Sequence, residues 1–184
     1  MTDTQRMAPL PAAGRDPRTE ELLLALRFDP DADDMNLFTT LAHHPRLLKR
    51  WSAFGGLLLA GGTLPARDRE VLILRTAANC GADYEWGHHQ PMGRHAGLTD
   101  DEMAALAGPD AASVDAVLVR SADELHADSI LSDETWAALA ERYDEQQLIE
   151  VCMVVGQYHL VAFTLRSLGI QPEAGVASIP GRSA

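Results

Sequence analysis

A phenol, a carboxylate and two imidazoles lie within six residues of this sequence, in the stretch YEWGHH that runs from Tyr84 to His89. Residues three and four apart share one face of a helix, so a helix here would place Glu85 beside both His88 and His89. Carboxylates and imidazoles are the side chains that most often move protons in enzymes. The stretch therefore predicts a site for acid/base chemistry.

A second carboxylate, Glu70, lies upstream and begins a helix that is too apolar for an ordinary surface helix. Glu70 shares a face with Ile73, Leu74 and Ala77, and burial there would raise its pKa towards the range that is useful for proton transfer. The alternative is a structural role, as an acid in the first helical turn or in an ion pair with a neighbouring arginine: Arg67, Arg69 or Arg75. The sequence leaves both interpretations open.

Three neighbouring candidates have structural alternatives as well. Trp86 suits a packing role better than a platform for substrate, and Tyr84 could be either a buried hydrogen-bonded phenol or an acid/base group. His159 lies in an apolar helix and needs a polar partner there. Glu85 and His88 match the Glu-x-x-His element of di-iron helical bundles, but the sequence has no second such element. We therefore expect no metal site.

Composition excludes several classes of partner. A chain of 184 residues with 46% hydrophobic content suits one domain with a substantial core. The net charge of −12 argues against nucleic acid and anionic membrane surfaces, because both are bound through Lys and Arg. The N-terminus has no uninterrupted apolar run, and the two cysteines form no disulfide framework. We expect a soluble cytoplasmic protein with reduced thiols.

The pattern of caps and apolar residues is helical almost throughout, and no segment alternates convincingly with the period of two of a strand. Thr99 and Glu102 form a predicted capping box, and Ser132 and Asp144 each precede apolar residues at helical spacing. The expected fold is all-α. Its helices are predicted near residues 19–28, 35–43, 45–60, 66–80, 83–96, 100–107, 111–127, 133–142 and 145–168.

Two tails are expected to flank a single helical domain. Residues 1–17 form the predicted flexible N-terminal tail, residues 18–170 the domain, and residues 171–184 the C-terminal tail. Pro172 and Gly175 cannot continue the last helix, so we expect the C-terminal tail to cross the surface of the domain or of a partner.

One segment resembles a known family: Leu64–Leu106, LPARDREVLILRTAANCGADYEWGHHQPMGRHAGLTDDEMAAL. It looks like the core of the carboxymuconolactone decarboxylase family, which includes the alkylhydroperoxidase D-like proteins. A weaker similarity covers the last predicted helix. The resemblance implies an all-α fold, homo-oligomers that are often trimers or hexamers, with a dimer as the alternative, and a site near subunit contacts.

The peroxidase branch of this family has a Glu, then a Cys-x-x-Cys pair, then a His four residues after the second Cys. Glu70 and His89 match the Glu and the His, whereas Ala82 and Glu85 stand at the two cysteine positions. Cys80 is two residues from the first position, which turns it about 200° around a helix. The resemblance therefore places the chain in the branch without the Cys-x-x-Cys pair.

The resemblance and the residues together imply acid/base chemistry without a cofactor, either decarboxylation or isomerisation, on a small organic acid or lactone. Glu70 or Glu85 would be the general base or acid and His89 the partnering acid. The other predicted site residues are hydrogen-bond donors and substrate contacts: Tyr84, His88, Arg75, Trp86 and His159. Of these, Arg75 would anchor a carboxylate, unless it only neutralises a nearby acid.

Two other functions stay open at this point. A peroxiredoxin-like antioxidant would depend on Cys80 or Cys152 and on an external resolving thiol. A non-enzymatic binding module would have Trp86 and its neighbours filling the site, with no ligand-sized cavity beside Glu85 and His89. We rank a carboxy-lyase-like enzyme first, the peroxidase second and the binding module third.

Overall fold

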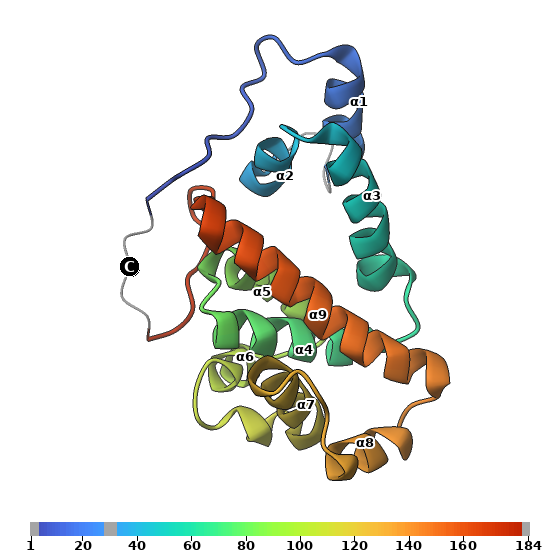
Figure 1. Ribbon diagram of the computed structural model, residues 1–184. Coiled ribbons are helices and arrows are strands. Elements are labelled where there is room, and N and C mark those ends of the chain that lie inside the picture. Colours follow the sequence, from blue (N-terminus) through green and yellow to red (C-terminus); the bar gives the residue numbers. More distant parts are fainter. Residues whose placement is uncertain (1–3, 28–32, 182–184) are drawn as a thin grey trace.

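The computed structural model describes residues 4–27 and 33–181, and every regular element within these two ranges is a helix. The elements, shown in Figure 1, are α1 (Pro17–Ala25), α2 (Asn36–Leu41), α3 (Pro45–Gly56), the π-helical turn η1 (Leu57–Gly61), α4 (Ala66–Cys80), α5 (Asp83–His95), α6 (Asp100–Leu106), the 3₁₀ turn η2 (Ala111–Ser113), α7 (Ala116–Ala127), α8 (Asp133–Ala140) and α9 (Glu145–Leu168). The predicted all-α fold is confirmed for this part of the chain. Residue 28 of the first predicted helix, and residues 1–3 and 182–184 of the two predicted tails, lie outside the described residues.

The fold is built around α4, which is buried on nearly every side. Val71, Leu72, Ile73 and Leu74 have no exposed surface, because α4 packs against α5, α7 and α9. In Figure 1, α9 runs across the front of α4 and α5, with α7 and α8 below and α1, α2 and α3 above. This burial within one chain accounts for the apolar composition of α4.

Helix starts follow the local capping chemistry. Thr99 and Glu102 form the predicted capping box of α6, and Ser132 and Asp144 cap α8 and α9. The predicted helix over residues 111–127 is divided into η2 and α7. The division falls at Asp115, whose extended backbone and side-chain acceptor start a new helix.

The long helix α9 combines a buried face with an exposed apolar face. In the described ranges it is the one helix whose length and composition would allow it to cross a membrane, but half of its apolar stretch is buried inside the fold. That burial is typical of the core helix of a soluble domain. The outward face exposes four large apolar side chains: Ile149, Met153, Leu160 and Phe163.

Both terminal segments lie against the helices. The N–H groups of Arg6 and Met7 donate to the carbonyl of Leu168 at the end of α9. The C-terminal segment passes close to α5, where a Cβ added to Gly87 would lie only 2.3 Å from the carbonyl oxygen of Ala177. Further along this segment, Ile179 is buried in the main core.

Candidate active site

Most of the predicted site lies on α5, which is held directly against α4. The two helices are joined at Gly81, whose φ of 61° lies in the left-handed region that favours glycine. This tight turn packs α5 against α4 and buries Tyr84, Glu85, Trp86 and His89. A polar stretch is thereby removed from water, which changes the proton affinity of its titratable groups.

Glu70 and His89 form a buried hydrogen-bonded pair between α4 and α5. His89 Nδ1 lies 2.8 Å from Glu70 Oε2, and Arg69 Nε lies 3.6 Å from the other carboxylate oxygen of Glu70. With Nδ1–H donating to the carboxylate, the lone pair of His89 is on Nε2, which is the arrangement of a general base. Glu70 is fully buried and His89 is 8% exposed, so a substrate can reach the pair only through the imidazole.

Glu85, one helical turn before His89, is a buried carboxylic acid. It is 2% exposed, and neither side-chain oxygen has a hydrogen-bond partner among the described residues. Burial raises the pKa of Glu85 well above its usual value. The surroundings of Glu85 therefore favour its protonated form, which can donate a proton.

His88 and His89 of α5 bind carboxylates other than Glu85, which helical spacing places beside them. His89 pairs with Glu70, and His88 Nε2 lies 2.6 Å from Glu173 Oε2. Tertiary packing brings these distant, hydrogen-bonded carboxylates to the imidazoles, and it leaves Glu85 facing the interior. The three residues share the predicted helix, but the carboxylates that bind the two histidines are Glu70 and Glu173.

Tyr84 and His88 hold the C-terminal segment on α5. The hydroxyl of Tyr84 accepts from the N–H of Leu37 at 3.2 Å and donates to Glu173 Oε1 at 2.9 Å. Burial opposes ionisation of Glu173, but hydrogen bonds from His88, from the N–H of Asn36 and from Tyr84 lower its pKa to about 2. Of the two alternatives for Tyr84, the structure supports the buried hydrogen-bonded phenol, and Glu173 is a partner that the sequence did not single out.

Tyr158 on α9 is the site residue that sequence reasoning missed. Its ring meets the ring of His89 edge to face at a centroid distance of 4.9 Å. Burial, followed by the charges of Glu70 and Glu85, raises the pKa of the Tyr158 phenol well above its usual value. Tyr158 thus lies close to both carboxylates and to the imidazole. The signal in the sequence is a phenol within an apolar helix, one residue before His159.

The surroundings of Arg75 and Trp86 indicate structural roles for both residues. The guanidinium of Arg75 donates to Asp123 at 2.7 and 3.0 Å and to the carbonyls of Leu106 and Gly108. These contacts support the second interpretation of Arg75, in which its guanidinium neutralises a nearby acid. Trp86 is fully buried in the main core, in agreement with the packing role.

The two thiols are poorly suited to peroxide chemistry, which needs a thiolate. Burial and the charge of Glu85 raise the pKa of Cys80 to about 11. Burial also raises the pKa of Cys152. His159 lies away from the Glu70–His89 pair and contacts His126 of α7 instead.

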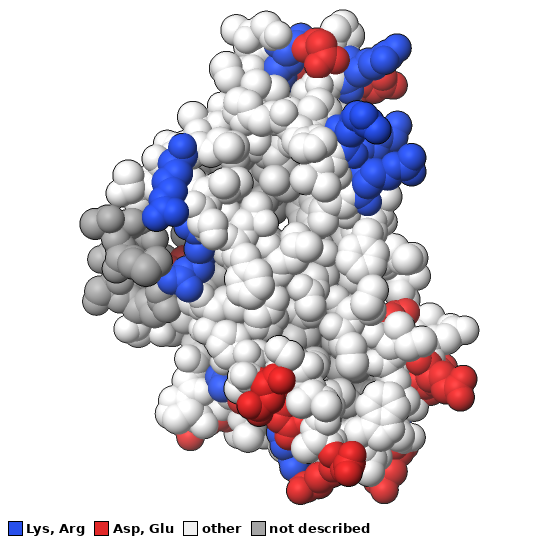
Figure 2. Space-filling model, in the orientation of Figure 1, with Lys and Arg blue, Asp and Glu red and all other residues white. Residues whose placement is uncertain are grey.

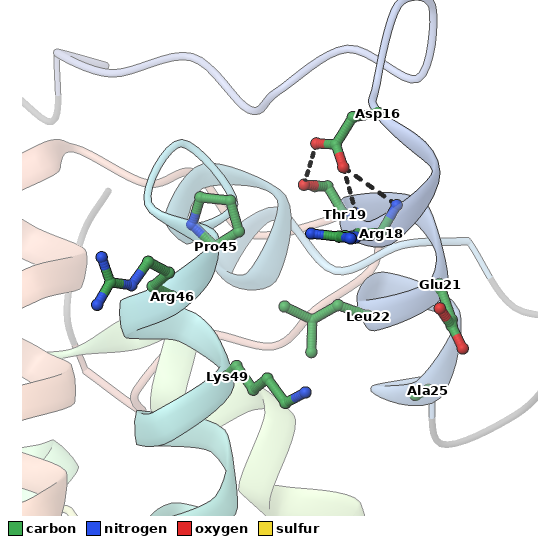
Figure 3. Close-up of a pocket in the computed structure, with 9 residues that line it drawn as sticks. All are labelled: Asp16, Arg18, Thr19, Glu21, Leu22, Ala25, Pro45, Arg46 and Lys49. Atoms are coloured by element: carbon green, nitrogen blue, oxygen red, sulfur yellow. Dashed lines mark hydrogen bonds between the residues drawn. The ribbon is translucent and has the colours of Figure 1, made fainter.

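A surface pocket of about 620 Å³ lies elsewhere, between α1 and α3. Figure 3 shows that its Asp16 carboxylate caps α1, by accepting from Thr19 and from the N–H of Arg18. Lys49 extends beneath Leu22, whereas the guanidinium of Arg46 points away. None of the predicted site residues lines this pocket. Its polar groups serve the helix cap and do not converge on a common point.

Comparison with solved structures supports the same fold. An uncharacterised peroxidase-related protein from Ralstonia eutropha, described as an alkylhydroperoxidase AhpD core, is 18% identical, with a TM-score of 0.77 over 93% of this chain and 95% of that one. A peroxidase-related protein from a Silicibacter species is 15% identical, with a TM-score of 0.78 over 96% and 97%. The debrominase Bmp8, in complex with 2,3,4-tribromopyrrole, is 16% identical, with a TM-score of 0.70 over 93% of each chain.

Comparison of the sequence with known families gives a match for one segment of the chain. No curated protein matches the chain. Residues 45–125, which contain α3 to α6 and most of α7, match the carboxymuconolactone decarboxylase family. This segment includes Glu70, Glu85 and His89, and the solved structures show the same helical arrangement over nearly the whole length. Residues 45–125 thus resemble the carboxymuconolactone decarboxylase family, and the chain has the helical fold of the alkylhydroperoxidase D-like structures.

Proposed function

We propose that this protein is an enzyme that transfers protons without a cofactor, in the decarboxylation or isomerisation of a small organic acid or lactone. One observation carries the proposal. Glu85 is a buried acid without a hydrogen-bond partner in the described chain, one helical turn from a histidine that Glu70 orients. Two carboxylates in different surroundings, one hydrogen-bonded and one without a partner, are the usual basis for separate acid and base roles.

Each residue has a defined step in this chemistry. In a decarboxylation, the bond between carbon and the carboxylate breaks, carbon dioxide leaves, and the electron pair stays on the carbon. Glu85 then gives its proton to that carbon and is reprotonated from solvent. In an isomerisation, His89 Nε2 removes a proton from one carbon and Glu85 supplies one to another, after which the proton on His89 returns to Glu85.

The departure from the peroxidase pattern supports proton transfer over redox chemistry. The peroxidase branch keeps a thiol at the position of Glu85, and both thiols of this chain have raised pKa values. A carboxylic acid at this position donates a proton but cannot reduce a peroxide. The proposal therefore ranks the antioxidant function below the acid/base enzyme.

The activity can be tested with a panel of lactones and 3-oxo acids in heavy water, beginning with carboxymuconolactone, the compound in the family name. NMR would follow carbon dioxide release and deuterium incorporation at carbon. We expect turnover by the wild type and a loss of about 100-fold or more in Glu85→Gln and His89→Gln. His95→Gln, which changes an exposed histidine on the same helix, should retain activity.

Two results would contradict the proposal. One is a substrate of this panel that Glu85→Gln and His89→Gln turn over as fast as the wild type. The other is peroxide reduction that is lost in Cys80→Ser, without deuterium incorporation into any member of the panel. Circular dichroism and an unfolding midpoint for each variant would show that the loss of turnover does not come from misfolding.

We also propose that the protein acts as a cytoplasmic homo-oligomer, with a trimer or hexamer as the expected assembly. The support is the outward face of α9, where Leu160 and Phe163 are 48% and 61% exposed. Figure 2 shows a broad uncharged surface across the middle of this side of the molecule, with Lys and Arg side chains gathered over α3 and acidic ones towards the lower edge. A contiguous apolar surface of this kind is typical of a contact between protein chains.

A further inference from the structure

Three helices bring a thiol and two imidazoles together outside the proposed active site. Cys80 ends α4, His126 lies in the last turn of α7, and His159 lies in the middle of α9. Their ligand atoms all lie within 4.8 Å of one another. No other group of three or more histidine, cysteine or acidic side chains converges in this way in the described ranges.

The hydrogen bond that His159 makes to the backbone suits a metal ligand. His159 Nδ1 lies 2.8 Å from the carbonyl of Val155, one turn earlier on α9, and therefore carries the hydrogen. This leaves the lone pair of His159 on Nε2, which points to His126 Nδ1 at 2.8 Å. A hydrogen bond to a backbone carbonyl is the common way in which proteins orient a histidine that binds a metal.

We propose that Cys80, His126 and His159 bind one Zn²⁺ ion through Sγ, Nδ1 and Nε2. A thiolate with two imidazoles is a ligand set that Zn²⁺ prefers. On binding, zinc replaces the hydrogen on Cys80 Sγ and the hydrogen that His126 Nδ1 donates to His159. His126 takes the tautomer that carries its hydrogen on Nε2, so one proton in total leaves to solvent. No change of oxidation state is involved.

The observed spacing needs only a small adjustment to hold the ion. With bonds of about 2.3 Å to sulfur and about 2.0 Å to nitrogen, a tetrahedral zinc ion separates two nitrogens by about 3.3 Å and a nitrogen from sulfur by about 3.5 Å. The present separations are 2.8 Å between the two nitrogens and 3.9 Å between His126 Nδ1 and Cys80 Sγ. These two separations differ from the zinc geometry by about half an ångström. The third pair, Cys80 Sγ and His159 Nε2, lies within 4.8 Å and closes by side-chain rotation.

The surroundings leave one coordination position open. Cys80 is buried, His159 is partly buried and His126 is exposed, so solvent reaches the cluster from the side of His126. Three protein ligands with a fourth position for water distinguish open zinc sites from closed structural ones, which have four protein ligands. The proposal concerns residues that the acid/base mechanism does not use and stands independently of it.

Metal binding can be measured on the full-length protein after dialysis against a chelator. We expect the protein to bind one equivalent of Zn²⁺ by isothermal titration calorimetry, and to give a thiolate-to-metal charge-transfer band when Co²⁺ replaces Zn²⁺. His126→Gln and His159→Gln should weaken zinc binding by about 100-fold or more. Cys80→Ser should also remove the charge-transfer band.

Two matched variants serve as controls. Cys152→Ser changes the other thiol, and His95→Gln changes an exposed histidine outside the cluster. Both should bind zinc as the wild type does. The proposal is overturned if the wild type binds less than one equivalent, if the cluster variants bind as tightly as the wild type, or if Cys152→Ser removes the charge-transfer band. Circular dichroism of each variant in the absence of metal separates loss of ligands from loss of fold.

Discussion

At the scale of residues, two buried carboxylates in one site have different surroundings. Glu70 accepts a hydrogen bond from His89 and lies close to Arg69, whereas Glu85 has no partner among the described residues. A buried charge is stable only when it is paired, so Glu85 is the group that keeps its proton. Glu70 instead holds the imidazole in the form that leaves Nε2 free. The division of roles between acid and base follows from these contacts.

The raised pKa of Glu85 has a cost in stability. Its carboxyl group has a higher pKa in the folded protein than the unfolded value of 4.5. The folded state therefore holds a proton that the unfolded chain releases above this pH, and stability falls as the pH rises from there. Proteins retain such destabilising groups chiefly at functional sites, which is why Glu85 supports a functional interpretation.

At the scale of elements, the contact between α5 and the C-terminal segment depends on Glu173. Its pKa of about 2 lies below the ordinary 4.5. The stability that it contributes is therefore fully present above about pH 4.5 and is lost as the pH falls towards 2. We expect Glu173→Gln to lower the free energy of unfolding at pH 6 by about 2 kcal/mol, after allowance for solvent screening.

Urea unfolding at a series of pH values would check this prediction. The difference in stability between the wild type and Glu173→Gln should shrink as the pH falls from 4.5 to 2. Glu21→Gln, which changes an exposed acid on α1, is the control and should leave the stability unchanged. A difference that stays constant over this pH range would show that Glu173 does not act through its charge.

The helices were largely predictable because their signals are local. The capping residues, and the apolar residues that follow them, predicted α9 with its observed bounds, residues 145–168. Glu173 was not predictable in the same way, because it lies in a segment without periodicity and meets His88 and Tyr84 more than 80 residues away in sequence. The cluster of Cys80, His126 and His159 was not predictable either, because its three residues lie far apart in the sequence.

At the scale of the whole molecule, the outward face of α9 leads to a prediction about assembly. Ile149, Met153, Leu160 and Phe163 recur at helical spacing and are all exposed in a single chain of 19.9 kDa. We expect light scattering after size exclusion to give the mass of three or six copies, because contacts between copies would remove this apolar face from water. Leu160→Glu should dissociate the assembly by placing a charge in the contact.

A matched variant separates this effect from general surface polarity. Ile130 is 68% exposed in the loop between α7 and α8, so Ile130→Glu changes an even more exposed apolar side chain away from the face. It should leave the assembly intact. A monomeric wild type, or a Leu160→Glu variant that keeps the mass of the wild type, would contradict the predicted interface.

The family resemblance over about forty residues was sufficient to predict the fold, and it included three of the central site residues: Glu70, Glu85 and His89. It could not predict which of them are hydrogen-bonded to one another. That depends on how α4, α5 and α9 pack, and the same packing brings Tyr158 to His89. The sequence thus indicated the groups that do the chemistry, whereas their pairing required the structure.

The central claim is that Glu85 is a protonated carboxylic acid at neutral pH. It can be tested directly by NMR titration of protein labelled with ¹³C at the glutamate side-chain carboxyl carbons, with Glu85→Gln used to assign the resonance. We predict that the Glu85 signal stays at the position of the protonated form at pH 7. A Glu85 resonance that titrates near pH 4.5 would contradict the account.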